Sequence, residues 1–307
     1  MEEEAAVEGQ RHRRTVVVGI DGSEAALDAV RWGAAEAERW REPLRLVTAF
    51  GLLADGVSAR QTSQQRYRDA LLHRARRHLA EAAAVAAQHD RHIEVEQELL
   101  VGHPVFVLGA ESRHARLVVI GDHGQSRIDD FLVGSVAVGL AVHAHCPVVV
   151  VRQGQDRPDA AAQPVVVGVD GSATGDDTLA FAFEAAETRH VPLVAVHAWS
   201  DRLMDLVVRP PVELAAFAAT ERDLLVERLA GWTLKYPDVA VTTVVTGGGA
   251  ARALIEQASR AQLLVVGSRG RGELSGLLLG SVGHAVLHRA ACPVAVVRPD
   301  PVANGRG

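Results

Sequence analysis

The stretch Val17-Val18-Gly19-Ile20-Asp21-Gly22-Ser23 combines a β-branched apolar run with a polar turn sequence. It recurs later in the chain as Val166-Val167-Gly168-Val169-Asp170-Gly171-Ser172. A second stretch, Cys146-Pro147-Val148, recurs as Cys292-Pro293-Val294 in the same order. Repetition at matched positions is the signature of a duplicated structural unit. The chain therefore contains two copies of one domain.

Within each copy, short apolar runs alternate with longer helical patterns. The runs are residues 15–20, 44–50, 93–101, 117–121 and 148–151, then 165–169, 193–199, 239–245, 263–267 and 294–297. Most are continuous and β-branched, which is typical of parallel strands covered on both faces. The pattern predicts an α/β fold in each copy, a five-stranded parallel sheet with helices on both faces. In the helix after the first strand, small residues between Ala26 and Ala37 form the buried stripe, and Glu36 is expected to face water.

The length of 307 residues agrees with about two domains. A polar, proline-containing stretch without periodicity separates the copies and is interpreted as a linker. The predicted segments are a disordered tail at 1–13, a first domain at 14–152, the linker at 153–163, a second domain at 164–299 and a tail at 300–307.

Composition excludes several classes of function. A formal net charge of −6 argues against nucleic acid as the main partner. Lys235 is the single lysine and does not lie in a Walker-A sequence, which excludes a P-loop. Cys146 and Cys292 are too few for a thiolate metal site and are expected to be reduced. No apolar run is long enough for a signal peptide or a membrane span, so a cytoplasmic protein that does not bind membranes is expected.

The pattern G-x2-G-x9-G-S follows the fourth predicted strand of both copies. The first copy has Gly121, Gly124, Gly134 and Ser135, and the second has Gly267, Gly270, Gly280 and Ser281. Glycines let the backbone approach a ligand closely, and a serine that opens a helix presents a hydroxyl and free amides to an anion. Such a loop can hold phosphates without a lysine.

These motifs together resemble the universal stress protein family, in particular its tandem-domain members. The resemblance covers about residues 14–152 and 164–299. It implies two doubly wound, Rossmann-like domains of the adenine-nucleotide alpha-hydrolase type. In nucleotide-binding members it also implies ATP, with magnesium, at the carboxyl ends of the strands. The rule for ligand sites in open α/β sheets gives the same location.

The resemblance implies a role for each matching residue. Asp21 and Asp170 are expected on the adenosine side of the ligand, and Ala49 and Ala198 are expected to line the adenine. The residues expected to hold ribose and phosphates are Gly121, Gly124, Gly134, Ser135, Val136, Gly267, Arg269, Gly270, Gly280, Ser281 and Val282. Turn formation and core packing are the alternative interpretations of the same residues.

The two loops differ in charge. Arg269 and Arg271 occur in the second loop, beside Glu273, whereas the first carries Asp122, Asp129 and Asp130 against His123 and Arg127. A like charge near a phosphate costs about 1–3 kcal/mol at an effective dielectric of about 20. The second site is therefore predicted to bind ATP more tightly than the first.

The sequence favours an ATP-binding regulatory protein of the stress response that need not be an enzyme. Two alternatives stay open: a dimerisation scaffold that binds no nucleotide, and a slow ATPase. The expected partners are an adenine nucleotide and an unidentified regulatory protein. The two copies are expected to pair through strands 148–151 and 294–297, and two chains could form a homodimer. Segments 51–65 and 200–212 are long enough to be lids, although plain surface connections are favoured. The histidines do not recur at metal-ligand spacing, so no metal site is expected.

Overall fold

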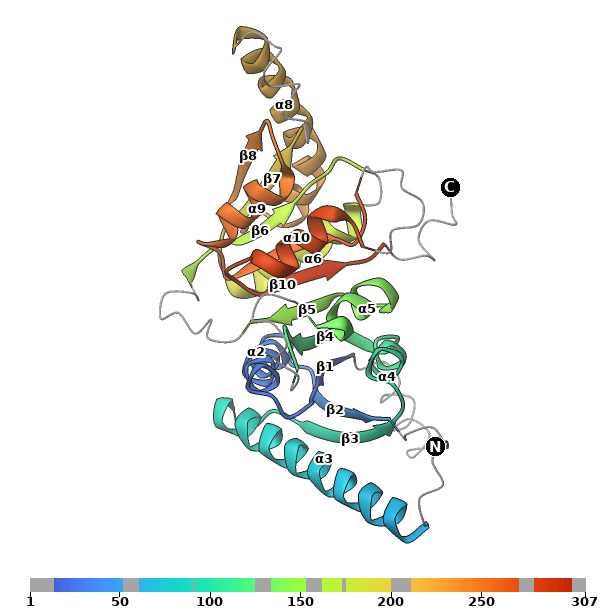
Figure 1. Cartoon of the computed structure of the whole chain (residues 1–307). Helices are drawn as coiled ribbons and strands as arrows, with labels where there is room; N and C mark the ends of the chain where they lie inside the picture. The colour runs from blue at the N-terminus through green and yellow to red at the C-terminus, as the bar shows by residue number, and fades with distance from the viewer. Residues whose placement is uncertain are drawn as a thin grey trace, which may run out of the picture. The chain divides into compact units, whose positions relative to one another are not determined.

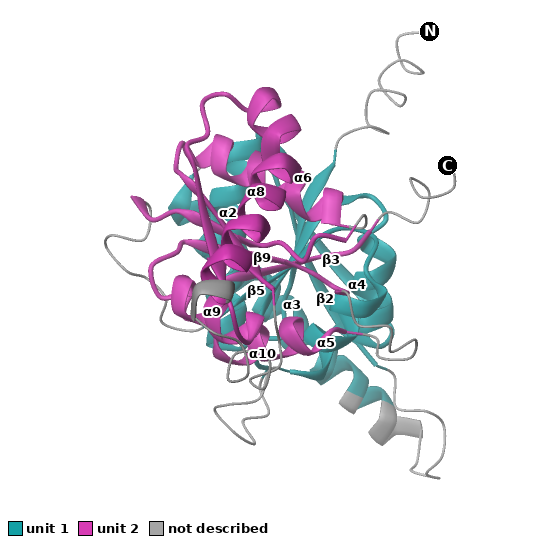
Figure 2. Ribbon diagram, turned by 90° about the horizontal axis from the view of Figure 1, so that it is seen from above, with its two compact units in different colours: residues 1–153 teal, residues 154–307 magenta. Residues whose placement is uncertain are grey.

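The computed structural model describes residues 14–51, 61–90, 92–124, 134–152, 162–172, 175–199, 211–270 and 279–299. The chain divides into two compact units, residues 1–153 and 154–307 (Figure 2). The predicted tails, most of the linker and most of segments 51–65 and 200–212 lie outside the described residues. No helix in the described part is long and apolar enough to cross a membrane.

Unit 1 contains a five-stranded sheet with the strand order β3-β2-β1-β4-β5. Each neighbouring pair in that order is parallel. Its elements are β1 (Thr15–Gly19), α2 (Glu24–Trp40), β2 (Leu44–Phe50), α3 (Gln61–His89), β3 (Val95–Val101), α4 (Pro104–Glu111), β4 (Ala115–Gly121), α5 (Ser135–His143) and β5 (Val148–Val151). Helix α3 begins at Gln61, so the last residues of the connection predicted at 51–65 are helical.

Unit 2 repeats this arrangement with the strand order β10-β9-β6-β7-β8, again with parallel neighbours. Its elements are β6 (Val165–Gly168), α6 (Asp176–Arg189), β7 (Leu193–Ala198), α8 (Pro211–Lys235), β8 (Val241–Thr246), α9 (Ala250–Ala258), β9 (Leu263–Gly267), α10 (Ser281–Arg289) and β10 (Val294–Val297). The two units confirm the predicted tandem α/β fold.

Helices cover both faces of each sheet. In unit 1, α2 and α3 pack against each other on one face, and α4 and α5 pack together on the other (Figure 1). In unit 2, α6 with α8 and α9 with α10 form the corresponding pairs. Strands covered on both sides need apolar residues at successive positions. Val16, Val17 and Val18 of β1 are accordingly all inaccessible to solvent.

The first helix of each unit ends in the same way. Arg41 and His190 follow α2 and α6 in the left-handed conformation, both with φ 54°. Their amides donate to carbonyls of the last helical turn, which satisfies groups that a helix end leaves unpaired. Helix α2 also has a side-chain cap at its start, because Ser23 Oγ accepts from the amide of Ala26 at 3.1 Å.

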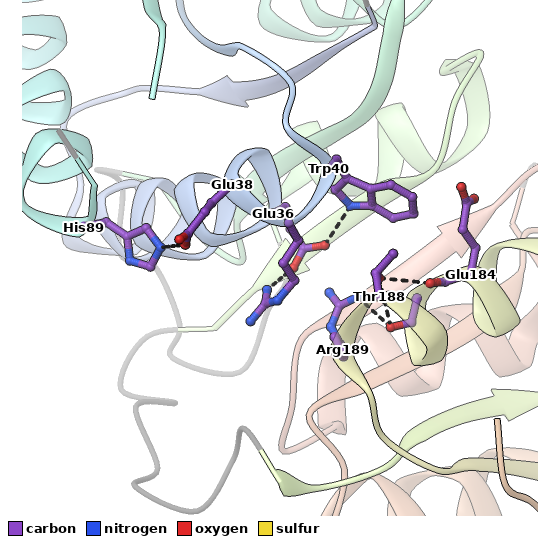
Figure 3. A network of polar contacts seen from close by, with 9 residues as sticks. Glu36, Glu38, Trp40, His89, Glu184, Thr188 and Arg189 are labelled. Carbon is purple, nitrogen blue, oxygen red and sulfur yellow. Dashed lines mark hydrogen bonds and ion pairs between the residues drawn. The ribbon is translucent and has the colours of Figure 1, made fainter. Parts of the chain in front are cut away.

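The prediction that Glu36 faces water is wrong. The residue is 1% exposed, and its carboxylate accepts hydrogen bonds from Arg39 Nη1 at 2.5 Å and Trp40 Nε1 at 3.2 Å (Figure 3). A buried carboxylate is stable only when it is paired in this way. Glu38, one of its neighbours on the helix, does face solvent, and its Oε2 lies 3.0 Å from His89 Nε2.

Aromatic side chains stack where α6 meets α8 in unit 2. The ring of Phe183 lies 6.0 Å from that of Trp232 and 5.5 Å from that of Tyr236. Lys235 Nζ lies 5.4 Å from the Trp232 ring and 5.1 Å from the Tyr236 ring. The single lysine of the chain therefore lies against two aromatic faces at the end of α8.

Candidate functional site

The aspartate that follows the first strand of each unit is held by the serine two residues later. Asp21 Oδ1 accepts from the amide of Ser23 at 2.9 Å and from its hydroxyl at 2.7 Å. Asp170 Oδ1 accepts from the amide and hydroxyl of Ser172 at the same distances. These bonds fix one carboxylate oxygen. The other oxygen of Asp170, Oδ2, is buried and has no hydrogen-bond partner in the described part of the chain.

The glycine loop of each unit lies against this second oxygen. A Cβ atom added to Gly124 would lie 2.6 Å from Asp21 Oδ2, and one added to Gly270 would lie 3.4 Å from Asp170 Oδ2. The two halves of the predicted site therefore meet, although they are about 100 residues apart in sequence. A larger residue at either glycine would fill the space in front of the carboxylate.

Helices α5 and α10 begin at the same edge. Gly134 and Gly280 are their N-caps, and neither helix start has a side-chain cap. The amide of Gly134 donates to Asp122 O at 2.7 Å, and that of Gly280 donates to Ser268 O at 3.0 Å. The first helical residues are Ser135 and Val136 in α5 and Ser281 and Val282 in α10. A helix start without a side-chain cap offers backbone amides to an anion.

The remaining predicted residues lie at the carboxyl ends of strands. Gly121 is the last residue of β4, and a Cβ atom there would lie 2.7 Å from the carbonyl carbon of Ala25 in α2. Gly267 ends β9. Strand register places Ala49 and Ala198 at the same edge, near the ends of β2 and β7. All predicted site residues are thus described, and those of each unit lie at one edge of its sheet.

The charges beside the first loop balance each other. Asp122 Oδ1 lies 2.7 Å from His123 Nδ1, and Asp122 Oδ2 lies 3.9 Å from Arg152 Nε. Burial raises the pKa of Asp122 above its usual range, and the electrostatic effects of His123 and Arg152 oppose that rise. Arg127, Asp129 and Asp130 lie outside the described residues.

The second loop has no carboxylate at the matching place. Ser268, which is 1% exposed, replaces the aspartate, and its hydroxyl has no hydrogen-bond partner among the described residues. Burial and the positive charge of Arg269 both lower the pKa of Arg298. Arg271 and Glu273 lie outside the described residues. The sequence analysis did not identify Arg152 or Arg298, although an arginine follows the last strand in both copies and that repetition is a usable signal.

The long helix of each unit contacts the aspartate loop through a nitrogen-containing side chain that the sequence analysis also missed. In unit 1 the ring of His78 on α3 packs against Gly22, where an added Cβ atom would lie 2.2 Å from His78 Cε1. In unit 2, Arg228 Nη2 on α8 donates to Ser172 O at 2.7 Å and to Asp176 Oδ1 at 2.9 Å. The two residue types differ, so the internal repeat gives no signal for this contact.

A second contact in unit 2 joins α8 to the end of β6. His197 is 4% exposed, with Nδ1 at 2.7 Å from Val169 O and Nε2 at 3.0 Å from Glu221 Oε2. The carbonyl can only accept, so Nδ1 carries the proton. The pair holds the residue that precedes Asp170. Unit 1 has Thr48 at the matching position, and its buried hydroxyl has no hydrogen-bond partner among the described residues.

The chemical groups at this edge are compatible with an anionic ligand such as a nucleotide. Each unit offers a carboxylate suited to hydroxyl groups, glycines that leave space in front of that carboxylate, and a helix start without a side-chain cap for phosphates. Among the described residues no group of three or more histidine, cysteine, aspartate or glutamate side chains is arranged to hold a metal ion.

The fold and this edge define a tandem α/β protein with one candidate ligand site in each unit. The universal stress protein family model matches residues 12–152 and 162–298. A universal stress protein of Mycobacterium tuberculosis is 41% identical over 293 residues, covering 92% of this chain and 96% of that protein. Another from the same organism is 39% identical over 302 residues, covering 94% of this chain and 98% of the relative. The chain belongs to the universal stress protein family.

Solved structures agree on the fold. The crystal structure of a universal stress protein from Archaeoglobus fulgidus matches with a TM-score of 0.68 at 19% identity, covering 93% of this chain and 98% of that chain. A universal stress protein structure from Pseudomonas aeruginosa matches with a TM-score of 0.61 at 15% identity, covering 96% and 97%. Both likenesses extend over the two units.

Proposed function

We propose that this protein is an ATP-binding regulator of the stress response, in which nucleotide occupancy changes the conformation of the tandem module or its choice of partner. The observation that carries the proposal is the meeting of Asp21 with Gly124 and of Asp170 with Gly270 at the edge where α5 and α10 begin. Ribose hydroxyls suit the carboxylate oxygen that faces the glycine loop, and phosphates suit the helix start. Magnesium would accompany the triphosphate as its counter-ion.

The second site is proposed to bind ATP more tightly than the first. Asp122 lies beside the first loop, where unit 2 has the neutral Ser268, and Arg269 follows in the second loop. A carboxylate near the phosphates opposes binding, whereas a guanidinium favours it.

Isothermal titration calorimetry of Mg-ATP into the nucleotide-stripped full chain tests the proposal. Gly124→Glu and Gly270→Glu would close the two sites separately. Matched controls are Gly109→Glu in α4 and Gly231→Glu in α8, where an added Cβ atom meets nothing within 4 Å. We expect two binding steps, with the weaker lost in Gly124→Glu, the tighter lost in Gly270→Glu and both kept in the controls.

Tryptophan fluorescence gives an independent reading of the second site. Trp199 directly follows Ala198, and its ring lies 4.9 Å from that of Phe217. Absence of binding by both methods would overturn the proposal in favour of a nucleotide-independent scaffold. Turnover of ATP above a slow background would instead replace the regulatory role with an ATPase.

A further inference from the structure

The last two strands of each unit place three matched side chains beside the glycine loop. Register pairs Gly121 with Val151 in unit 1 and Gly267 with Val297 in unit 2. The next residues are joined in the same way, because Asp122 N donates to Val151 O at 2.9 Å and Ser268 N donates to Val297 O at 2.8 Å. The matched sets are therefore Asp122, His123 and Arg152 in unit 1 and Ser268, Arg269 and Arg298 in unit 2.

In unit 1 the side chain of Asp122 places a carboxylate beside His123 and Arg152. Asp122 lies between His123 and Arg152, and only 14% of its side chain is exposed. Its backbone carbonyl also accepts from the N-cap amide of α5, so the residue is fixed at the start of that helix. Asp122 thus offsets the positive charge of Arg152 beside the first loop before any ligand arrives.

In unit 2 the same framework carries two guanidinium groups and no carboxylate at the three matched positions. Ser268 is neutral, fully buried and hydrogen-bonded through its carbonyl to the N-cap amide of α10. Burial lowers the pKa of Arg298, and the positive charge of Arg269 lowers it further. Asp21 and Asp170 hold equivalent places in the two units, so their negative charges do not contribute to the difference in charge between the two sites.

We infer that the residue after the fourth strand of each unit, Asp122 or Ser268, sets the number of ligand phosphates that the site selects. The site of unit 2 (site 2) selects adenine nucleotides with more phosphates, because each added phosphate is attracted by the positive charges of Arg269 and Arg298. The site of unit 1 is called site 1. Site 1 gains little from added phosphates and accepts adenosine or its monophosphate almost as well as the triphosphate. The inference rests on the proposed function, because it requires adenine ligands at this edge.

The test is a ligand series titrated into the full chain with one site closed at a time. Gly124→Glu leaves site 2 open, and Gly270→Glu leaves site 1 open. Adenosine, AMP, ADP and ATP are titrated at fixed ionic strength in excess EDTA, so that the charge of the ligand rises with each phosphate. The measured quantity is the ratio of the ATP affinity to the adenosine affinity in each site.

We expect this ratio to be at least about tenfold larger in site 2, the size expected for one like charge at an effective dielectric of about 20. Ser268→Asp should lower the ratio in site 2, and Asp122→Ser should raise it in site 1. Ser268→Asn and Asp122→Asn are matched neutral controls: the first should leave the ratio of site 2 high, and the second should raise that of site 1. If burial of a new carboxylate unfolds Ser268→Asp, the two Asp122 variants still decide the question.

This inference would be overturned, with nucleotide binding left intact, if the ratio of ATP to adenosine affinity were equal in the two sites. It would also be overturned if the Asp122 and Ser268 substitutions did not change that ratio. Loss of all binding in EDTA, with Mg-ATP still bound, would also overturn it, because a metal ion and not the side chains would then hold the phosphates. Failure of every adenine ligand with and without magnesium would instead refute the proposed function itself.

Discussion

Replacing Gly22 by alanine should destabilise unit 1 through two separable effects. Gly22 has φ 84°, a left-handed conformation that costs a residue with a Cβ atom about 1–2 kcal/mol. The new Cβ atom would also lie 2.2 Å from Cε1 and 2.3 Å from Nδ1 of His78. Forcing an extra carbon into a packed contact costs about 1–3 kcal/mol. Gly22→Ala should therefore lower the free energy of unfolding of unit 1 by about 2–5 kcal/mol.

A double-mutant cycle with His78→Ala separates the two effects. In the His78→Ala background the overlap is gone, so Gly22→Ala should cost only the backbone contribution of about 1–2 kcal/mol. Native-state hydrogen exchange read by mass spectrometry gives both values from peptides that cover β1 and β4. Peptides from β6 and β9 serve as the internal reference in unit 2. An equal cost in both backgrounds would show that the His78 contact is not the source of the strain.

Three other outcomes can be measured on the same chain. Burial raises the pKa of Cys146 from 9.0 to about 12. In a Cys292→Ala variant, where Cys146 is the remaining thiol, alkylation at pH 8 should therefore be about 1,000-fold slower in the folded protein than in urea. Equal rates would contradict this. Ser23→Ala removes the cap of α2 and should cost about 1 kcal/mol, with Ser23→Thr largely restoring it; unchanged exchange of the α2 amides would disprove the capping role. Burial raises the pKa of Asp122, so the contribution of this residue to stability is greatest below pH 3.8 and is lost as the pH rises through the folded-state pKa. As the pH rises over that range, Asp122→Asn should gain stability relative to the parent protein. A stability difference between the two proteins that is the same at every pH, measured by urea unfolding, would refute this prediction.

Much of the fold could be predicted because it depends on local pattern. Continuous β-branched runs such as Val16–Val18 become strands that are inaccessible on both faces, and the duplicated motifs give the number of units. Glu36 shows the limit of this reasoning. Its helical position suggests a solvent-facing carboxylate, but Arg39 and Trp40 pair with it and allow it to be buried. Helical periodicity alone does not reveal such pairing.

The candidate site divides in the same way. The glycines and aspartates repeat at fixed spacing, so the sequence names them, and strand topology explains why Asp170 faces Gly270. The supporting contacts depend on α3 and α8, whose sequences differ between the copies. His78 in unit 1 and Arg228 in unit 2 contact equivalent loops with different chemical groups, and the His197–Glu221 pair has no counterpart at Thr48 among the described residues. Such contacts join distant segments and have no signature in a single sequence.

The stacking of Lys235 against Trp232 and Tyr236 has a practical consequence for chemical labelling. Apart from the α-amine, the chain offers one amine to acylating reagents, because all other basic side chains with permanent charge are arginines. An amine-reactive dye at the end of α8 would lie beside two rings that can quench it. One labelled position would then report on how α8 packs against α6 in unit 2, without a competing signal from side chains of unit 1.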